Sequence, residues 1–568
     1  MRQVIVAGVL AATTLLGLAP ARAEELTFDD EKVADAIERA KTFLLAAQLP
    51  NGSWSKEKLH DVGITAMCTY ALLEAGVKPT QEDVKKALTW LTEQNCTYTY
   101  SLALRCQAYL SAERHGSRGA YKAFLKKDAE LLAHSGLVNG GRYSYNTPGA
   151  AGDNSNSQYG LLGVWAAAQL GLEVPEGYWE RVAKHWQGCQ GPDGGWHYDP
   201  TKPAAGKAFA TMTAAGIATV LVCFEQLTPG AFADCRGPNQ PAAVENGLDW
   251  MERYFVEIVG GAKAAKAARE LDKQRKDQEA EETKKVLSEL SPDDRQRFQQ
   301  EENKRLAEER KRQRPAGELH GFQAPAGWMY YFLYGVERVG LASGYKYFGT
   351  ADWYKVGAER LLNEQSKNGR WGAELFNTAF ATIFLVRGRH PILFNKLSYR
   401  GRWRNRPHDL PNLARWIGDN SETTVNWQSI NPSVPVRDWH DAPIVYIAGS
   451  TAPYFTPAEI AKLRRYVEEG GTILSVAECG GADFKAGIRL AYQKIFPQYE
   501  MAAIKPDHEM NTTLALLPVA PAALPPMFAI SNGVRPLAVH IEGDLPKSWQ
   551  MRRTRMPETA FEIGANVT

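Results

Sequence analysis

Motifs that mark most metal, nucleotide and hydrolase sites are missing from this sequence. The seven cysteines form no Cys-x-x-Cys pair, and the eleven histidines include neither a His-Glu-x-x-His motif nor a pair four residues apart. P-loop and Gly-x-Ser-x-Gly patterns are absent as well. Because zinc ribbons, helical zinc proteases, P-loop nucleotide sites and α/β-hydrolase nucleophiles depend on these spacings, the sequence indicates none of them. We expect no metal and no cofactor.

An excess of charge of one sign is also lacking. The net charge is +2 and 44% of the residues are hydrophobic, so nothing in the composition predicts binding to nucleic acid. The length of 568 residues predicts two or more domains.

Residues 1–23 have the pattern of a secretory signal peptide. Arg2 precedes an apolar stretch at 4–18, and Ala21-Arg22-Ala23 is a cleavage site of the small-x-small type. Since the apolar stretch is short, a cleaved signal is favoured over a membrane anchor, and membrane association is not signalled. We therefore expect export to the periplasm or the exterior, with cleavage after Ala23.

One polar loop recurs along the first two thirds of the chain. It reads Gln190-Gly-Pro-Asp-Gly-Gly-Trp196 in the middle copy, Gln48-Leu-Pro-Asn-Gly-Ser-Trp54 in the first and Gln365-Ser-Lys-Asn-Gly-Arg-Trp371 in the last. The Asn-Gly or Asp-Gly pair supplies the positive φ of a tight turn, and the tryptophan gives the turn a large apolar body to pack. Three copies predict a repeat architecture.

Helical periodicity surrounds these loops and predicts six helical hairpins. Amphipathic outer helices are expected near 31–48, 80–94, 119–134, 176–189, 240–258 and 350–365. Each precedes a helix that is apolar almost all round, near 63–75, 99–113, 156–170, 208–226, 325–341 and 375–387. An all-round apolar helix is typical of a buried inner ring.

A charged insertion interrupts the fifth hairpin at 260–317. Residues 263–314 mix Lys and Arg with Asp and Glu and hold few apolar residues, without a sustained heptad. A solvated helical hairpin or a disordered segment is the favoured interpretation, and a partner-binding arm is the alternative.

The repeated loop resembles the QW-type repeat of squalene–hopene cyclases and protein prenyltransferases, over residues 31–390. This resemblance implies an all-α (α/α)6 toroid for residues 24–390. The activities of that fold each need a motif that is missing here: the Asp-x-Asp-Asp acid of the cyclases, the Asp-x-Cys zinc pair of the prenyltransferases and the Gly-Cys-Gly-Glu-Gln thioester sequence. Fold alone does not imply function, so the resemblance does not predict an enzyme.

A second domain is predicted after a linker at 391–422. Strands are expected at 423–430, 443–448 and 472–477, with a helix at 457–469 capped by Thr456. Strand, helix and strand at this spacing indicate a parallel, Rossmann-like sheet. The basic, aromatic stretch at 400–408 is expected to pack across the domain junction.

This second domain, residues 423–568, resembles the glutamine-amidotransferase-like domain of an uncharacterised bacterial family, domain of unknown function 4159. The resemblance implies a small α/β domain of the class I amidotransferase type. The family's domain is expected to continue beyond Phe561-Glu-Ile-Gly564, so the domain in this sequence is possibly truncated.

Candidate functional residues fall into two groups. Inner-helix ends of the first domain carry aromatic and small polar residues of the kind that line ligand pockets. These ligand-binding candidates are Asp153, Asn154, Asn156, Tyr159, His197 and Tyr330. The simpler interpretation is that the tyrosines belong to the core of the ring and that the Asp153 group caps a helix.

The second group is a possible catalytic triad. Cys479, between Glu478 and Gly480, follows a strand as the nucleophile of an elbow does, and His540 and Glu542 have the His-x-Glu form of the class I amidotransferase partners. The alternative is that Cys479 is only a small residue at the end of a strand.

From these patterns we expect an exported, non-catalytic binding or scaffold protein with a hydrophobic ligand or a protein partner. An enzyme acting on a polyprenyl or terpenoid substrate is the first alternative. A cysteine-dependent amidotransferase or hydrolase at Cys479 is the second.

Overall fold

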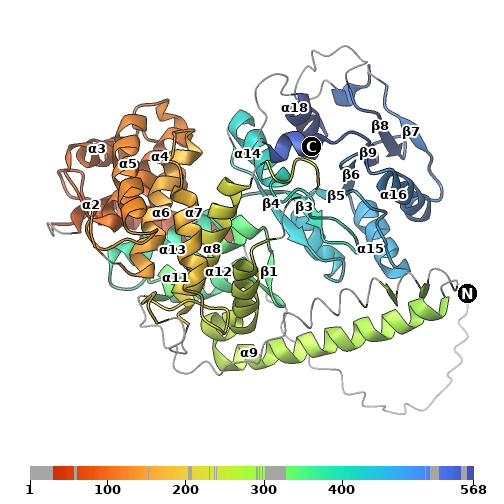
Figure 1. Ribbon diagram of the computed structural model, residues 1–568, viewed down its shortest axis with the longest axis horizontal. Helices are drawn as coiled ribbons and strands as arrows, with labels where there is room; N and C mark the ends of the chain where they lie inside the picture. The colour runs from red at the N-terminus through yellow and green to blue at the C-terminus, as the bar shows by residue number, and fades with distance from the viewer. Residues whose placement is uncertain are drawn as a thin grey trace, which may run out of the picture.

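The computed structural model contains a helical domain and an α/β domain that lie side by side (Figure 1). It describes residues 30–567 except for 57–59, 151, 203–207, 229, 236, 238–239, 290–291, 293–294, 297–298, 301–302, 304–327, 422, 506, 512–523 and 552–558. The predicted signal peptide at 1–23 lies outside the described residues, as does most of the charged insertion after 290.

Inner helices form a closed circuit in the helical domain. They are α2 (Asp61–Glu74), α4 (Thr99–Ala112), α6 (Asn154–Gln169), α8 (Ala210–Leu227), α11 (Trp328–Ser343) and α13 (Leu375–Gly388). Each packs against the next, and α13 packs back against α2. These helices fall where the apolar pattern predicts them, because a helix covered on all sides needs apolar residues on every face.

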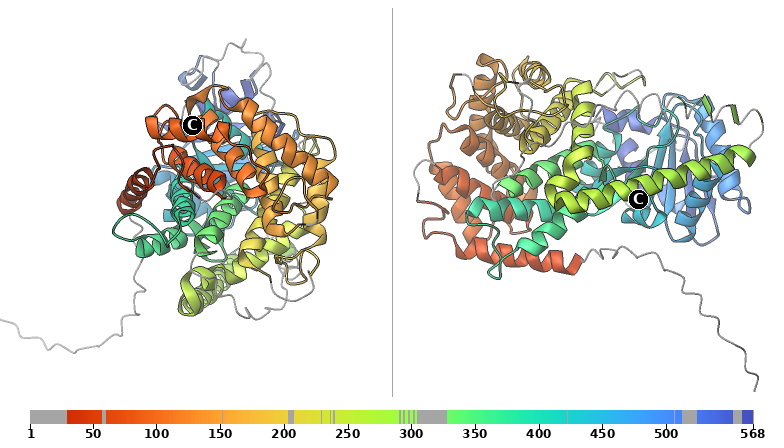
Figure 2. Two further views of the ribbon diagram at one scale, coloured as in Figure 1. Left: turned by 90° about the vertical axis from the view of Figure 1, so that its left-hand side faces the viewer. Right: turned by 90° about the horizontal axis from the view of Figure 1, so that it is seen from below.

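Outer helices alternate with the inner ones along the chain. They are α1 (Asp30–Ala46), α3 (Glu82–Glu93), α5 (Lys122–Val138), α7 (Tyr178–Gly188), α9 (Ala242–Glu289) and α12 (Trp353–Glu364). The first of them, α1, contacts both α12 and α13, so the first and last hairpins meet. Figure 2, left, shows this domain end-on.

The three copies of the repeated loop make the same contacts. The indole Nε1 of Trp54, Trp196 and Trp371 donates to a carbonyl of the preceding outer helix, at 2.6, 2.8 and 2.8 Å. Their backbone N–H groups donate to the hydroxyl of a threonine on the following inner helix, at 3.1, 3.1 and 3.0 Å. Each tryptophan therefore fixes the angle between the two helices of its own hairpin.

The glutamine of each loop joins one hairpin to the next. Gln48 Nε2 donates to the Gly52 and Asp83 carbonyls, and Gln190 Nε2 to those of Gly194 and Ala243. In the last copy Gln365 Nε2 donates to Gly369 O at 3.0 Å and to Ala36 O of α1 at 2.8 Å, which closes the ring.

The loop glycine is required for the same contact. Gly369 has φ +87°, and a Cβ there would collide with the Arg39 carbonyl of α1. Only glycine meets both conditions without strain.

Helix α9 continues beyond the ring as an arm. Gly261, at φ +79°, breaks the helical geometry, and the helix then runs on to Glu289 beneath the α/β domain (Figures 1 and 2). The described part of the insertion is thus helical, and the part of the predicted arm beyond 303 lies outside the described residues.

Helix α8 is long and apolar enough to span a membrane, but 78% of that window is buried. Its contacts with α9 and α11 within the ring account for the composition without a membrane.

The α/β domain is built on a mixed seven-stranded sheet with strand order β4-β3-β5-β6-β9-β8-β7. The strands are β3 (Ile392–Leu397), β4 (Asn426–Ile430), β5 (Ile444–Gly449), β6 (Thr472–Ala477), β7 (Met501–Ala503), β8 (Met527–Ser531) and β9 (Pro536–Ile541). In this order, neighbouring strands from β4 to β9 pair in parallel, whereas β8 pairs antiparallel with both β9 and β7. The predicted parallel pairing therefore holds from β4 to β9 and does not hold for β8, which is antiparallel to its neighbours.

Two elements occupy the stretch that the sequence interprets as a linker. β3 lies inside the sheet between β4 and β5, and α14 (Asp409–Ser421) packs on α17 (Leu545–Gln550) and α18 (Thr559–Asn566). The range 391–422 thus belongs to the second domain. The predicted linker contains Asn395 and Lys396, polar residues that are buried in β3 and hid the strand.

Helix α15 (Pro457–Glu468) begins where the sequence predicts. Thr456 accepts a hydrogen bond from the Glu459 N–H, and the Glu459 carboxylate accepts one from the Thr456 N–H. This capping box satisfies two N–H groups of the first turn that have no partner within the helix.

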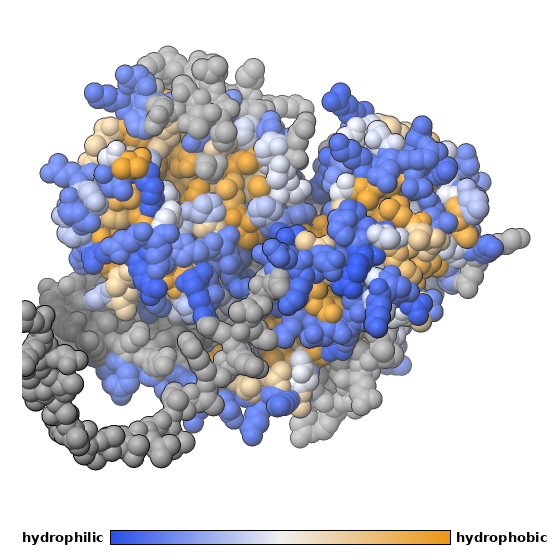
Figure 3. All heavy atoms as spheres, turned by 180° about the vertical axis from the view of Figure 1, so that it is seen from behind, coloured by the Kyte–Doolittle hydropathy of each residue, from blue (hydrophilic) through white to orange (hydrophobic). Residues whose placement is uncertain are grey.

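The two domains are in close contact. Ser429 of β4 donates its N–H to Gly344 O at 2.6 Å, Tyr347 donates its hydroxyl to Asp438 at 2.9 Å, and Lys346 pairs with Asp441. A disulfide joins Cys235, after α8, to Cys479, after β6. Seen from behind, hydrophilic residues dominate the surface, and apolar areas are visible on both domains (Figure 3).

Candidate functional site

The carboxyl edge of the sheet is the first place to look for a site, since the ends of parallel strands form a crevice there. Glu478 and Cys479 follow β6, and Asp544 follows β9. Asn405 and Arg406 reach the same edge from the loop after β3, because Arg406 contacts both Asp544 and Cys479. This edge faces the helical domain, to which Cys479 is bonded.

Cys479 has the backbone geometry of a nucleophile elbow. It lies between the end of β6 at Ala477 and the start of α16 (Ala482–Ile495), with φ +52°. Its N–H donates to Asp544 Oδ2 at 3.0 Å. A strand, a sharp turn with positive φ and a helix are the parts of such an elbow. However, the sulfur is bonded to Cys235, so the structure offers no free thiol at this position.

Arg406 carries the positive charge of the edge. Its side chain is fully buried, with Nη2 at 2.7 Å from Asp544 Oδ2 and 3.0 Å from Cys479 Sγ. Among the described residues, its Nε and Nη1 have no hydrogen-bond partner. The Arg406 guanidinium is therefore held by one carboxylate and has N–H donors left over.

Glu478 is an acidic group of this edge whose pKa is strongly raised. Burial raises its pKa to about 8, while the Lys396 charge acts in the opposite direction. Asn405 Nδ2 donates to its Oε2 at 2.8 Å, and the described part of the chain offers its Oε1 no hydrogen-bond partner. Burial therefore favours the neutral form of the Glu478 carboxyl, directly beside the elbow.

A second buried ion pair lies deeper in the sheet. Lys396 Nζ is 2.6 Å from Asp409 Oδ1 and donates to Arg406 O at 2.8 Å, and Tyr446 donates its hydroxyl to Asp409 Oδ2 at 3.0 Å. The pair fixes the Arg406 loop on β3 and β5 and so positions the groups of the edge.

The other two predicted triad members do not reach Cys479. His540 lies opposite Ser475 within the sheet, and its Nδ1 is 2.8 Å from the Ser475 hydroxyl. Its Nε2 is 3.9 Å from Glu542, whose carboxylate pairs with Arg489 at 2.7 Å. Burial lowers the pKa of His540 to about 4. His540 and Glu542 are neighbours without a hydrogen bond between them, and the predicted triad is not assembled, because Cys479 lies beyond the end of β6 and is oxidised.

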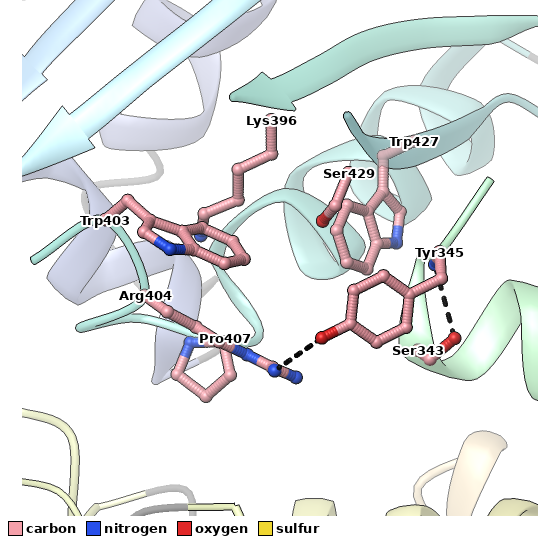
Figure 4. Close-up of a pocket in the computed structure, with 8 residues that line it drawn as sticks. All are labelled: Ser343, Tyr345, Lys396, Trp403, Arg404, Pro407, Trp427 and Ser429. Carbon is pink, nitrogen blue, oxygen red and sulfur yellow. Dashed lines mark hydrogen bonds between the residues drawn. The ribbon is translucent and has the colours of Figure 1, made fainter. Parts of the chain in front are cut away.

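A small aromatic cavity lies at the domain junction (Figure 4). Tyr345 follows α11, Trp427 lies on β4, and Trp403 and Arg404 come from the loop after β3. Arg404 donates to the Tyr345 hydroxyl at 3.4 Å. The volume of about 10 Å³ is enough for about one water molecule and no larger ligand. The stretch at 400–408 thus packs across the junction, as the sequence predicts.

One end of the ring is filled by tyrosines. Tyr100 donates to Ser155 at 2.7 Å, and Ser155 lies 3.2 Å from the Tyr331 hydroxyl. The Tyr159 ring stacks on Tyr331 at 6.1 Å between centroids and lies 4.8 Å from the Tyr100 ring. Tyr330, next to Tyr331 in the chain, is also buried on α11. Tyr159 and Tyr330, predicted as ligand-binding candidates, are here members of the ring core.

The polar candidates of the first domain mostly hold loops in place. Asp153 caps α6 by accepting the Asn156 N–H at 2.8 Å, and its second oxygen accepts from the Asn156 side chain at 2.9 Å. Asn154 donates to the His197 carbonyl at 2.8 Å and lies 2.9 Å from His185 Nε2. The structure thus brings Asp153, Asn154, Asn156 and His197 together around the start of α6.

Three groups of the carboxyl edge were missed by sequence reasoning: Arg406, Asp544 and Cys235. Arg406 was hidden among several arginines of a presumed linker, and Asp544 follows a strand whose pattern is weak. The pairing of Cys235 with a residue 244 positions away is not encoded by any local spacing. Among the described residues, no three His, Cys, Asp or Glu side chains are grouped as a metal site.

Comparison with known proteins agrees with this division of the chain. Residues 393–568 match the model of Domain of unknown function (DUF4159). This match begins at β3, in agreement with the position of that strand inside the sheet.

The helical N-terminal region resembles type II terpene cyclases of known structure. One is type II terpene cyclase MstE from Scytonema in its apo form, with 15% identity over 63% of this chain and 98% of that chain and a TM-score of 0.26. A variant of that cyclase in complex with geranylgeranyl dihydroxybenzoate matches with 15% identity, 63% and 97% coverage and a TM-score of 0.25. No curated protein matches the chain.

Proposed function

We propose that this protein is an exported binding protein without catalytic activity. In this proposal an (α/α)6 toroid of the terpenoid-cyclase type and a class I amidotransferase-like α/β domain act as one unit. The observation that carries it is the bond between Cys235 and Cys479. This bond consumes the thiol at the elbow and covalently attaches the other domain to it.

Contacts on the other side of the junction support a fixed arrangement. Lys346 is 2% exposed and pairs with Asp441, and the Asp438 carboxylate accepts from Tyr347 at 2.9 Å. An ion pair whose lysine is buried tolerates little relative motion, because separating the partners leaves the lysine charge without compensation. Two unrelated kinds of link at separate points favour a single rigid body that displays ligand or partner sites.

The disulfide also supports export. Disulfides persist in oxidising compartments and are rare in the reducing cytosol. A cleaved signal at 1–23 would bring the chain to the periplasm or the exterior. A hydrophobic ligand or a protein partner is the expected occupant, and the arm at 263–314 is a candidate partner site.

The two catalytic alternatives lack support from specific contacts. A terpenoid-converting enzyme needs an acid that projects into the ring, whereas both Asp153 oxygens are engaged with Asn156. A cysteine hydrolase needs a base beside the thiol, whereas His540 is engaged with Ser475.

The test uses the variant Cys235→Ser, which releases the Cys479 thiol and keeps every residue of the elbow. We expect neither wild type nor variant to release ammonia from L-glutamine or to hydrolyse an activated aryl ester, and wild type to leave geranylgeranyl-bearing aromatics unconverted. Iodoacetamide should label Cys479 in the variant and not in the oxidised wild type, which verifies that the thiol is free. Turnover that is present in Cys235→Ser and lost in Cys235→Ser/Cys479→Ser would refute the proposal.

A further inference from the structure

A basin on the outer rim of the helical domain collects positive charge. It lies between the turn after α5, the outer helix α7 and Pro200 in the loop beyond Trp196, and its volume is about 710 Å³. Ligand pockets for small molecules have volumes of roughly 300–1,000 Å³. None of the site residues predicted from the sequence lines it, although Asn154 contacts His185, which does.

Helical spacing places the α7 residues that line the basin on one face. Lys184, His185 and Gly188 follow Arg181 by three, four and seven residues, so all four positions lie on the same side of the helix. Arg142 faces them from the turn after α5. No carboxylate is among the lining residues.

Two of these cations have no side-chain partner among the described residues. Arg181 donates to the Leu137 carbonyl at 3.2 Å. For the side chains of Arg142 and Lys184, the described part of the chain provides no hydrogen bond and no ion pair within 4 Å. Glu180 is one turn from Lys184 on α7 and does not pair with it. Three like charges around one concavity repel one another, and an anion bound between them relieves this repulsion.

The floor of the basin is fixed and uncharged. His185 Nε2 is 2.9 Å from Asn154 Oδ1, and the buried Cys189 sulfur is 3.7 Å from the same oxygen. Burial, with the Arg142 charge as a further cause, lowers the pKa of His185 to about 4, so this ring is neutral at pH 7. Gly140 and Gly188 have open space where a Cβ would be, which lets a ligand approach their backbone.

We propose that this basin binds a small ligand that carries phosphate or diphosphate groups. Guanidinium groups bind phosphate oxygens with two parallel hydrogen bonds, and a lysine adds a point charge. Two arginines and one lysine match a group with two or more negative charges better than a single carboxylate. The inference rests on the proposed function in that the protein binds its ligand and does not convert it.

Calorimetric titration of the full chain with pyrophosphate and inorganic phosphate tests the inference. The variant Arg142→Gln/Lys184→Gln removes the two unpaired cations. The control Arg39→Gln/Lys86→Gln removes the same charge from α1 and α3, where both residues pair with carboxylates. We expect saturable binding of pyrophosphate to wild type, at least about tenfold weaker binding to the first variant, and a change of less than about twofold in the control.

Vesicle sedimentation distinguishes the source of the phosphate. Binding to vesicles that contain phosphatidic acid, and not to pure phosphatidylcholine, would assign the site to a lipid headgroup if the first variant loses it. Binding of free pyrophosphate alone would assign it to a soluble ligand. Absence of both, or an equal loss in the control, would overturn the inference. Failure to bind phosphate would not change the outcome of the Cys235→Ser turnover assay. Turnover by Cys235→Ser would likewise not change phosphate binding, so the two experiments test the two proposals separately.

Discussion

Removal of the Gln365 side chain tests how the ring is closed. Gln365 Nε2 makes two hydrogen bonds, one to Gly369 O in its own loop at 3.0 Å and one to Ala36 O in α1 at 2.8 Å. Each bond contributes about 1 kcal/mol net, and part of this loss is offset because alanine has no rotamer entropy to lose on folding. For Gln365→Ala we expect the free energy of unfolding of the helical domain to fall by about 1–2 kcal/mol.

Urea unfolding followed by the helical circular dichroism signal measures this change. Gln48→Ala should cost a similar amount, because Gln48 makes the same two bonds between the first and second hairpins. Gln94→Ala is the matched control, since among the described residues the Gln94 amide bonds only to Trp90 O of its own helix, and its expected cost is below about 0.5 kcal/mol. If Gln365→Ala and Gln94→Ala are equally stable, the loop glutamines do not join the hairpins and the reasoning is refuted.

Two further predictions concern buried polar groups. Trp196→Phe should lower the free energy of unfolding by about 1–2 kcal/mol, because the Trp186 carbonyl loses its donor at 2.8 Å. Trp165→Phe is the control and should cost less, because the Trp165 indole N–H has no hydrogen-bond partner among the described residues. Urea unfolding that shows Trp165→Phe to be the less stable variant would contradict this prediction. The pKa of Glu478 is raised to about 8, so the folded state holds a proton that the unfolded state has lost, and the stability due to this group falls as pH rises from about 5 through 8. Unfolding of wild type and Glu478→Gln at several pH values should show the wild type losing stability relative to the variant over this window, and parallel curves would show that Glu478 titrates normally.

Sequence patterns predicted the elements whose causes are local. The inner helices follow from unbroken apolar stretches, and the start of α15 follows from Thr456 and Glu459, which lie within one helical turn. The loop of Asp193, Gly194 and Trp196 was recognised because all of its residues lie within a few positions. In each case the residues that cause the structure are neighbours in the chain.

Elements stabilised by distant partners were missed. β3 contains Asn395 and Lys396, which are buried because Asn395 donates to Trp439 O and Lys396 pairs with Asp409. A strand with two central polar residues does not fit an apolar pattern, and their partners lie up to 44 residues away. His540 is buried in β9 for the same reason, through Ser475 of β6.

The predicted triad failed for a reason that links fold and function. Cys479 has the positive φ of an elbow, a conformation that costs a non-glycine residue roughly 1–3 kcal/mol and persists only where its surroundings hold it. In a nucleophile elbow the strain presents a thiol to a substrate. Here the Asp544 carboxylate accepts the Cys479 N–H, and Cys235, itself at φ +60°, holds the sulfur. The same backbone shape therefore serves to present a cysteine to the neighbouring domain, and sequence alone does not distinguish the two uses, because both need a small turn directly after a strand.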